Sequence, residues 1–460
     1  MTTQPLTIQA YLNDSWQDIA IIEFDEGKKI TGLTYLSDYS LEHFLADNHF
    51  AASINYPVEL FAYNLTHKSD SHWLPFLDDI TPAGASRRYW SQRLDLSRLT
   101  NAEQNYELLK RATIAPVGHL RIKESLSNLD EVTPIKFSLA EIKDRDVDFL
   151  EYASEHGAMA GGATGAGGEA PKLLLRWQND DAIWIDNHQL TDSLDNYYLV
   201  KYPRGSRKNI DCDILRAEYH FYHELHAMGM MTIDTKGMRL VEGERYPSLW
   251  LPRFDIEVDA AGNTRRYAME SVYSMLKKGA GSLLDHEQVI RQLIKIIENS
   301  QLVAEGFVFD RKAFVIEWVR RDLLNIAFGN SDNHGRNTAF MRDEQAIWLA
   351  PIYDFAPMKA DPDGIVRTIR WQNSNYTFAP TKPPSEKLES GGDYRFDLIA
   401  QTLADLVDPI DLLAELKITA NNLVHLKRRL QARGVADRIL DYPSISFETL
   451  PTKLIKWRLL

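Results

Sequence analysis

The hydrophobic pattern of the chain changes near its middle, and this change limits the possible folds more than any other feature. In the first 255 residues, apolar side chains come in short runs separated by turn residues, which favour strands. Strands are predicted over residues 8–12, 19–22, 172–177, 182–185, 197–202 and 249–254. Further on, apolar residues recur with helical spacing, and helices are predicted over residues 285–304, 313–328, 395–405, 409–416 and 419–433. A β-rich part followed by a helical part predicts a bilobal α+β architecture.

The length of the chain indicates more than one core. At 460 residues, two or three subdomains are expected. The predicted subdomains are a small β-rich one at 1–125, a second with a glycine-rich segment at 126–255, and a helical third at 256–460. Within this frame, residues 74–85 are interpreted as a loop and residues 213–228 as a helix.

Composition and charge disfavour several classes of protein. The net charge of −13, from 52 basic and 65 acidic residues, argues against direct charge-driven binding to nucleic acid. Cys212 is the single cysteine, so neither an intrachain disulfide nor a cysteine-based zinc cluster can form, which fits a reducing cytoplasm. The N-terminus lacks the pattern of a signal peptide, and no apolar run approaches the length of a membrane span. We therefore expect a cytoplasmic protein.

A glycine-rich segment precedes the predicted strand at 172–177. Residues 157–168 contain six glycines, and a glycine backbone can approach phosphates closely and form an anion-binding nest. The alternative is a flexible surface linker, because the segment has neither the Gly-Lys-Ser/Thr end of a Walker A motif nor the helix of a dinucleotide fingerprint. Its place before a strand hairpin favours a phosphate loop.

Lys201 and Glu218 form the next candidate part of a nucleotide site. Lys201 ends an apolar strand, and Glu218 lies on the apolar stripe of helix 213–228 together with Phe221 and Leu225. A buried carboxylate needs a partner, and a kinase pairs a strand lysine with a helix glutamate to hold the α- and β-phosphates. The alternatives are an exposed edge lysine and a glutamate that reaches solvent at the helix edge.

Residues 329–337, Gly-Asn-Ser-Asp-Asn-His-Gly-Arg-Asn, carry the most informative polar pattern. They follow a strongly apolar helix, so they emerge from a rigid element. Asp332 and Asn337 have the spacing Asp-x4-Asn, which kinases use for a base that accepts the hydroxyl proton and an amide oxygen that binds Mg²⁺. Asp354 follows a short strand and is a second candidate metal ligand. The alternatives are a turn capped by its own Asn and Asp side chains, and a solvent-facing acid at 354.

His334 and Arg336 lie between the two residues of this motif. His334 lacks the i, i+4 partner of helical zinc sites, so we interpret it as an orienting residue. Arg336 supplies positive charge near the transferred phosphoryl group in this interpretation. A glycine loop, a strand lysine, a helix glutamate, an Asp-x4-Asn loop and a further aspartate follow one another in the order found in protein kinases.

The chain resembles the HipA family of bacterial serine/threonine kinases, the toxins of HipA–HipB toxin–antitoxin systems. Residues 329–337 look like the family loop Gly-Asn-x-Asp-x-His-x-Lys-Asn, with Arg336 at the lysine position, and residues 349–354 resemble its Pro-x-Tyr-Asp metal motif. Other segments similar to the family are residues 74–79, 116–121, 167–175, 199–203 and 217–219. The resemblance covers most of the chain. It implies a bilobal, protein-kinase-like α+β fold with a small β-rich N-terminal subdomain and a helical C-lobe.

Carried over by motif, the resemblance implies ATP and Mg²⁺ as cofactors. Asp332 would be the catalytic base, with His334 and Arg336 beside it, and Asn337 and Asp354 would hold the metal ion. The residues implied to bind the nucleotide are Thr164, Gly165, Gly167, Gly168, Lys172, Lys201 and Glu218. Family members autophosphorylate a serine in or near the glycine loop. Here residues 157–172 contain no serine and Thr164 is their only hydroxyl, so either Thr164 takes this role or self-inactivation is absent.

The resemblance also implies partners. Related toxins phosphorylate proteins of translation, such as an aminoacyl-tRNA synthetase, and arrest growth. Their usual partner is a small HipB-like DNA-binding antitoxin, which would bring this acidic chain to DNA indirectly; no membrane partner is expected. Two other readings stay open. One is a small-molecule or lipid kinase of the same fold, and the other is a catalytically silent protein that binds a nucleotide or a partner.

Overall fold

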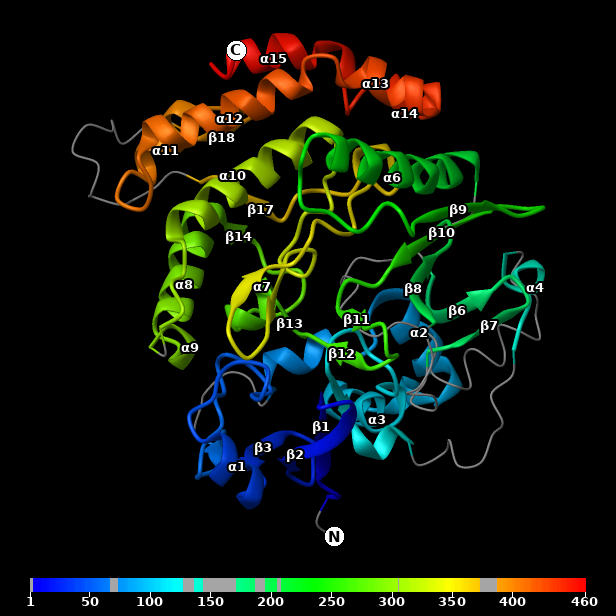
Figure 1. Cartoon of the computed structure of the whole chain (residues 1–460), viewed down its shortest axis with the longest axis vertical. Coiled ribbons are helices and arrows are strands. Elements are labelled where there is room, and N and C mark those ends of the chain that lie inside the picture. The colour runs from blue at the N-terminus through cyan, green and yellow to red at the C-terminus, as the bar shows by residue number, and fades with distance from the viewer. Residues whose placement is uncertain are drawn as a thin grey trace.

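A computed structural model of the chain describes residues 3–66, 73–126, 136–143, 171–186, 195–204, 208–304, 306–372 and 387–460. The N-terminal part lies at one end of the long axis, and the C-terminal helices lie at the other (Figure 1). The glycine-rich segment, with Thr164, Gly165, Gly167 and Gly168, lies outside the described residues. Within the described ranges, no helix has both the length and the apolar character needed to cross a membrane.

An antiparallel sheet with the strand order β4-β3-β2-β1-β5 forms the N-terminal part. Asn13 and Asp14, with φ of 49° and 59°, make the two-residue turn that suits the twist of the first hairpin. The strands are β1 (Leu6–Leu12), β2 (Ser15–Phe24), β3 (Ile30–Tyr35), β4 (Tyr63–Asn64) and β5 (Leu120–Ile122). The helices are α1 (Ser37–His43), η1 (Pro75–Asp79), α2 (Gly84–Arg93), η2 (Leu96–Arg98), α3 (Asn101–Ala112) and η3 (Lys123–Leu126). This sheet has a hydrophobic cluster of its own.

A second five-stranded antiparallel sheet, with the order β7-β6-β8-β10-β9, follows in the chain. Its strands are β6 (Lys172–Asn179), β7 (Ala182–Ile185), β8 (Asn196–Lys201), β9 (Arg239–Glu242) and β10 (Pro247–Pro252). Helix α4 (Leu139–Lys143) precedes the sheet in the chain, and helix α6 (Asn209–Ala227) packs against β10. Leu173, Leu175 and Val200 are fully or almost fully buried in the cluster beneath the sheet. The predicted strands at 172–177, 182–185 and 197–202 are therefore confirmed within one or two residues.

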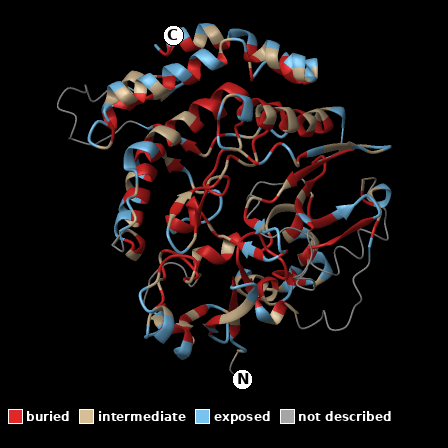
Figure 2. Ribbon diagram, viewed as in Figure 1, coloured by how far each residue is buried: buried red, intermediate tan, exposed pale blue. Residues whose placement is uncertain are grey.

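The C-terminal part is mainly helical and shares one large core with α6. Its helices are α7 (Val272–Met275), α8 (His286–Glu298), α9 (Gln301–Ala304), α10 (Arg311–Phe328), α11 (Phe396–Thr402), α12 (Pro409–Leu423), α13 (Leu426–Arg433), α14 (Asp437–Leu440), α15 (Leu450–Lys456), η5 (Met358–Ala360) and η6 (Phe447–Thr449). Its sheets contain β11 (Ile256–Val258), β12 (Thr264–Arg266), β13 (Ala268–Ser271), β14 (Leu284–Asp285), β15 (Ala339–Arg342), β16 (Ile347–Leu349), β17 (Ile369–Arg370), β18 (Glu389–Ser390) and β19 (Asp393–Tyr394). Figure 2 shows buried residues gathered along the inner strands and the central helices.

Three details differ from the sequence prediction. The single helix predicted over residues 285–304 is wrong, because α8 ends at Glu298 and α9 begins at Gln301. The break predicted between residues 416 and 419 is wrong, because α12 continues to Leu423 and the helices separate at Val424 and His425. The helix continues because residues 416–419 contain neither glycine nor proline. Within it, the Thr419 hydroxyl donates a hydrogen bond to Glu415 O over 3.0 Å. The predicted loop at 74–85 contains η1 and the start of α2. Proline at the first position of η1 suits a helix start, a signal that the loop interpretation overlooked.

Buried polar contacts connect the N-terminal part to the helical part. Glu270 of β13 accepts hydrogen bonds from Ser53 Oγ over 2.6 Å and from the backbone N–H of Ile54 over 3.0 Å. Arg342 Nη1 donates to the same carboxylate over 2.8 Å. The subdomain boundaries at 125 and 255 stay a prediction.

Candidate functional site

Lys201 and Glu218 form a buried ion pair. β8 ends at Lys201, and its ammonium donates to Glu218 Oε1 of α6 over 2.6 Å. The two side chains are 5% and 4% exposed. Tyr222, one turn along α6, donates its hydroxyl to the same oxygen over 3.0 Å. The glutamate therefore has the partners that a carboxylate in the core requires.

Asp354 connects this pair to a second lysine. Lys201 Nζ also donates to Asp354 Oδ1, and Lys172 Nζ donates to Asp354 Oδ2 over 3.1 Å. The two lysines are directly opposite each other on β6 and β8, so both ammonium groups reach one carboxylate. Asp354 has a left-handed backbone with φ of 53°, which aspartate tolerates better than most residues. We call Lys172, Lys201, Glu218 and Asp354 the lysine cluster.

The charges of the lysine cluster shift one another's pKa values. Burial alone would raise the pKa of Asp354, but Lys172 and Lys201 outweigh burial and hold that pKa below its ordinary value. Burial alone would lower the pKa of Lys201, but Asp354 and Glu218 raise it above its ordinary value. Asp354 and Lys201 are therefore charged at neutral pH. Burial lowers the pKa of Lys172, and the positive charge of Lys201 lowers it further. The negative charge of Asp354 opposes both effects.

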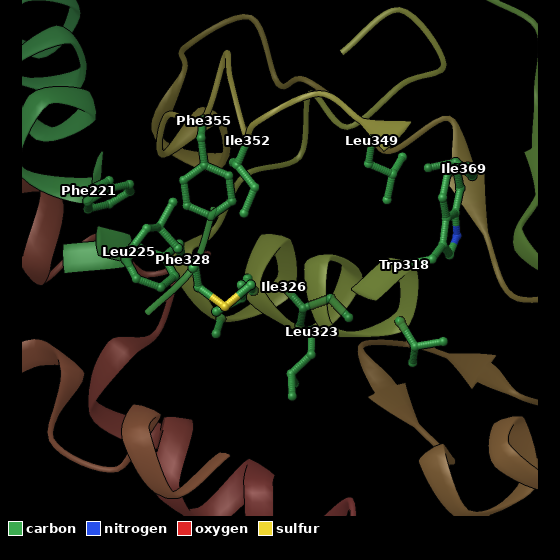
Figure 3. Close-up of a cluster of buried hydrophobic side chains, with 14 of the residues drawn as sticks. Phe221, Leu225, Trp318, Leu323, Ile326, Phe328, Leu349, Ile352, Phe355 and Ile369 are labelled. Carbon is green, nitrogen blue, oxygen red and sulfur yellow. The ribbon is translucent and has the colours of Figure 1, made fainter. Parts of the chain in front are cut away.

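An aromatic cluster holds three segments of the site in place. Phe221 of α6 and Phe328 at the end of α10 have ring centroids 4.9 Å apart, and Phe328 and Phe355 have centroids 5.2 Å apart (Figure 3). Both pairs meet edge to face, the favoured arrangement for buried rings. Glu218, the loop after α10 and Asp354 are thus all anchored in one core.

The loop after α10, residues 329–338, brings Asp332 and Asn337 together. We call it the catalytic loop, after the role that the sequence predicts for it. Gly329 ends α10 with φ of 73°, and a Cβ atom there would lie 2.8 Å from Ile445. The backbone N–H of Asp332 donates to Asn330 Oδ1 over 3.2 Å, and Asn337 Nδ2 donates to Asp332 O over 2.7 Å. These bonds fix the distance between the two motif residues.

His334 lies beside Asp332 without a direct hydrogen bond. Its Nε2 is 3.6 Å from Asp332 Oδ1, and its ring is stacked with Tyr273 at a centroid distance of 6.2 Å. The backbone N–H of Arg336 donates to His334 Nδ1 over 3.3 Å, so a neutral ring carries its proton on Nε2, toward Asp332. Burial lowers the pKa of His334, against the opposing effects of Asp332 and Asp354.

Arg336 contacts the N-terminal part. Its Nη2 lies 3.5 Å from Asp78 Oδ2 of η1, and its side chain is 3% exposed. Its backbone carbonyl accepts the hydroxyl of Tyr353 over 2.6 Å. The structure therefore shows Arg336 in contact with η1. Its role near a transferred phosphoryl group stays a prediction.

Two cavities share the lysine cluster as a common border. The first, of about 450 Å³, has Lys172, Lys201 and Asp354 at one side. Its other lining residues are mostly apolar: Val117, Leu199, Ile233, Leu251, Pro252, Arg253, Phe254, Asp255, Met269 and Tyr353. The second, of about 500 Å³, is lined by the whole lysine cluster together with Asp332. His334, Arg336 and Asn337 line neither cavity.

The oxygen atoms of the catalytic loop and Asp354 fit a divalent metal ion. Asn337 Oδ1 is buried and has no hydrogen-bond partner among the described residues. Asp354 lines both cavities, and its two oxygens accept hydrogen bonds from Lys201 and Lys172. Carboxylate and amide oxygens are the ligands that Mg²⁺ takes from proteins. The donor set that the sequence implies therefore suits this ion.

Sequence reasoning missed one wall of the first cavity. Arg253, Phe254 and Asp255 follow β10 and line it. Arg253 is held by Asp186 and Asp255, with Nη1 2.5 Å from Asp186 Oδ2 and Nε 3.0 Å from Asp255 Oδ1. An Arg-Phe-Asp run directly after an apolar strand is a signal for such a wall, but the sequence prediction assigned residues 249–254 only as a strand.

One protein family and two solved structures show similarity to this chain. The family described as HipA-like C-terminal domain matches residues 164–409. A chain of the Shewanella oneidensis MR-1 toxin–antitoxin complex of HipA, HipB and operator DNA is similar, with a TM-score of 0.63 and 15% identity over 98% of this chain and 97% of that chain. The Helicobacter pylori proinflammatory kinase CtkA gives a TM-score of 0.38 and 13% identity over 63% of this chain and 92% of that chain. No curated protein matches the sequence.

The likeness to the Shewanella chain over almost the full length confirms the predicted bilobal, kinase-like α+β fold. The family match spans more than half of the sequence and includes the lysine cluster and the catalytic loop. The chain belongs to the family of proteins with a HipA-like C-terminal domain.

Proposed function

We propose that this protein transfers the γ-phosphoryl group of ATP to a serine or threonine hydroxyl of another protein. The observation that carries the proposal is the lysine cluster between two cavities, one mostly apolar and one that also contains Asp332. An apolar cavity beside fixed cations suits a nucleotide base joined to phosphates. A carboxylate that lines the same cavity as the cations, Asp332, can accept the proton of a hydroxyl.

In this proposal the adenine occupies the first cavity, and Lys201 and Lys172 face the phosphates. Glu218 keeps Lys201 in position, as the helix glutamate of a kinase does. Asn337 and Asp354 would hold Mg²⁺, which would neutralise the negative charge of the phosphates. The nucleotide-binding roles of Thr164, Gly165, Gly167 and Gly168 remain proposals from the sequence alone.

Asp332 accepts the proton of the attacking hydroxyl. A new bond forms between the hydroxyl oxygen and the γ-phosphorus, the bond from that phosphorus to the bridging oxygen breaks, and ADP leaves with the electron pair. His334 Nε2, 3.6 Å from Asp332 Oδ1, orients that carboxylate and carries a proton toward it. Preorganised groups of this kind lower the barrier because they need no rearrangement during the reaction.

The proposed partner is a small HipB-like DNA-binding antitoxin. The structural likeness to a chain from a complex with HipB and operator DNA supports this proposal. The net charge of −13 disfavours direct contact of this chain with DNA, so a basic partner would make that contact. By resemblance to related toxins, the proposed substrate is a protein of the translation machinery, whose phosphorylation arrests growth.

The test is phosphate transfer from labelled ATP in the presence of Mg²⁺ to proteins of a bacterial lysate and to purified translation proteins. We expect transfer by the wild type and a loss of at least about 100-fold in Asp332→Asn, since general base catalysis contributes about that much. Asp437→Asn, at an exposed position in α14, is the matched control and should retain full activity. Equal transfer by wild type and Asp332→Asn would exclude the proposed base. Labelling of small molecules or lipids instead of protein would indicate a small-molecule or lipid kinase. The absence of any transfer would indicate a catalytically silent protein that binds a nucleotide or a partner.

A further inference from the structure

Two adjacent acids of η1 reach from the N-terminal part to the catalytic loop. Asp78 Oδ2 lies 3.5 Å from Arg336 Nη2. Trp73 Nε1 donates to the other oxygen of Asp78 over 2.8 Å, which fixes the direction of the carboxylate. Since Arg336 directly precedes Asn337, this contact acts on the segment that joins the two residues of the Asp-x4-Asn motif.

Asp79 reaches the same loop through a short strap, residues 271–273, at the start of α7. Asp79 Oδ2 accepts a hydrogen bond from the backbone N–H of Ser271 over 2.8 Å. The next two backbone N–H groups of the strap donate to carbonyls of the catalytic loop over 3.0 Å each, from Val272 to Thr338 and from Tyr273 to Gly335. Three consecutive donors thus join η1, the strap and the catalytic loop.

The strap also sets the position of the catalytic loop by close packing. The ring of Tyr273 lies so near Gly335 that a Cβ atom on Gly335 would be 2.5 Å from Tyr273 Cδ1. The same ring is stacked with His334, whose Nε2 lies 3.6 Å from Asp332 Oδ1. A small displacement of the strap would therefore move the proposed base and its orienting residue.

The buried carboxylate of Asp79 lowers the stability of the fold when it is ionised. Its side chain is buried, and Oδ1 has no hydrogen-bond partner among the residues that the structure describes. Burial, together with the negative charge of Glu270 of β13, raises the pKa of Asp79 to about 7, although Arg336 and the hydrogen bond from Ser271 lower it. An apolar side chain would fill this position without the cost of a buried carboxylate. The acid instead contributes a hydrogen bond to the strap and a negative charge that interacts with Arg336.

We propose that Asp78 and Asp79 are positioning residues that let the N-terminal part hold the catalytic loop in its working geometry. Asp78 holds the loop directly at Arg336, and Asp79 holds it through the strap. This inference rests on the proposed function, because the loop is catalytic only if the protein is a kinase. It assigns to the N-terminal part a direct influence on the rate of transfer, in addition to any role in binding a partner.

The test compares Asp79→Asn and Asp78→Asn with the matched control Asp47→Asn. Asparagine can still accept a hydrogen bond, but it removes the negative charge that strengthens the bond from Ser271 and faces Arg336. Asp47 lies in the same part, is equally buried and also accepts backbone N–H groups of the helical part, at Gln301 and Leu302, but these belong to α9. We expect kcat to fall at least about 10-fold in Asp79→Asn and Asp78→Asn, since small displacements at a reacting centre have effects of this size. KM for ATP should change less than about twofold, because the lysine cluster is untouched. Asp47→Asn should leave kcat within about twofold.

Two further readouts separate positioning from a merely structural role. Asp79→Asn should not lower the melting temperature at pH 8, because ionised Asp79 is disfavoured by burial and the variant removes that charge. The kcat of the wild type should fall as the pH drops through about 7 and Asp79 becomes neutral, and Asp79→Asn should lack this step. The groups that face Asp79 and tune this step are Arg336, Glu270 and Tyr353.

Amide hydrogen exchange of residues 330–338 gives a readout that does not require activity. Faster exchange in Asp79→Asn and Asp78→Asn, but not in Asp47→Asn, is expected. If the wild type transfers no phosphate while this exchange difference is present, the proposed function fails and the coupling of η1 to the loop stands. If the wild type is active, and the η1 variants keep both kcat and exchange rates, the inference is overturned. Loss of activity together with a lowered melting temperature in Asp79→Asn, as in any damaged fold, also contradicts it.

Discussion

At the scale of single residues, Asp354 is the acid on which both lysines of the cluster depend. Its replacement by asparagine leaves Lys172 and Lys201 buried with Glu218 as the remaining acid of the cluster. Removing one partner of a buried ion pair costs about 3–5 kcal/mol, so we expect Asp354→Asn to lose about 3 kcal/mol of unfolding free energy at pH 7. Urea unfolding measures the loss. Asp363→Asn, at an acid with a 70% exposed side chain near Arg204, is the control and should change stability by less than about 1 kcal/mol.

The pH dependence of this loss follows from the directions of the pKa shifts. The folded-state pKa of Asp354 is lowered, so its contribution is fully present above its unfolded pKa of about 4 and is lost as the pH falls further. The folded-state pKa of Lys201 is raised, so its contribution is fully present below about pH 10 and is lost above it. The stability difference between wild type and Asp354→Asn should therefore be constant between about pH 5 and pH 7 and shrink below about pH 4. A difference that increases on acidification contradicts the assigned ion pairs.

At the scale of elements, the catalytic loop is held by the contact between Gly335 and α7. A methyl group on Gly335 would lie 2.5 Å from Tyr273, so Gly335→Ala must displace either the loop or the strap. We expect kcat for phosphate transfer to fall about 100-fold, with the affinity for ATP unchanged because the first cavity is not affected. Gly279→Ala, just after α7, is the matched control, since nothing lies within 4 Å of its added methyl group. A nucleotide titration and a transfer assay on both variants check this; equal kcat values in the two would disprove it.

The elements also show how far the sequence alone could go. Local patterns predicted β6, β8, α6 and α10, because each has an apolar periodicity that its own residues define. Local patterns also placed Lys201 on a strand and Glu218 on an inward face, which is what their contact requires. The contact of η1 with the catalytic loop could not be predicted, because Asp78 and Arg336 are far apart in the chain and no periodicity relates them.

At the scale of the whole molecule, the two largest hydrophobic clusters are separate, and a polar cluster around Glu270 lies where the parts meet. Ile54 belongs to the N-terminal part in sequence but packs in the large core of the helical part. Its backbone N–H and the hydroxyl of Ser53 both donate to Glu270, which also pairs with the fully buried Arg342. These contacts couple the unfolding of the two parts.

Glu270→Gln tests this coupling. The variant keeps an acceptor for the Ser53 and Ile54 donors but leaves Arg342 buried without its charge partner, which should cost about 3 kcal/mol. In calorimetry we expect one transition for the wild type and two for Glu270→Gln, because the N-terminal part then unfolds first. Glu344→Gln, at a half-exposed acid paired with Arg265, is the control and should retain the single transition. If Glu270→Gln instead lowers the temperature of one undivided transition, the parts are coupled mainly through apolar contacts such as that of Ile54. Separate transitions would mean that the polar cluster around Glu270 contributes more to the coupling of the two parts than the apolar contacts do.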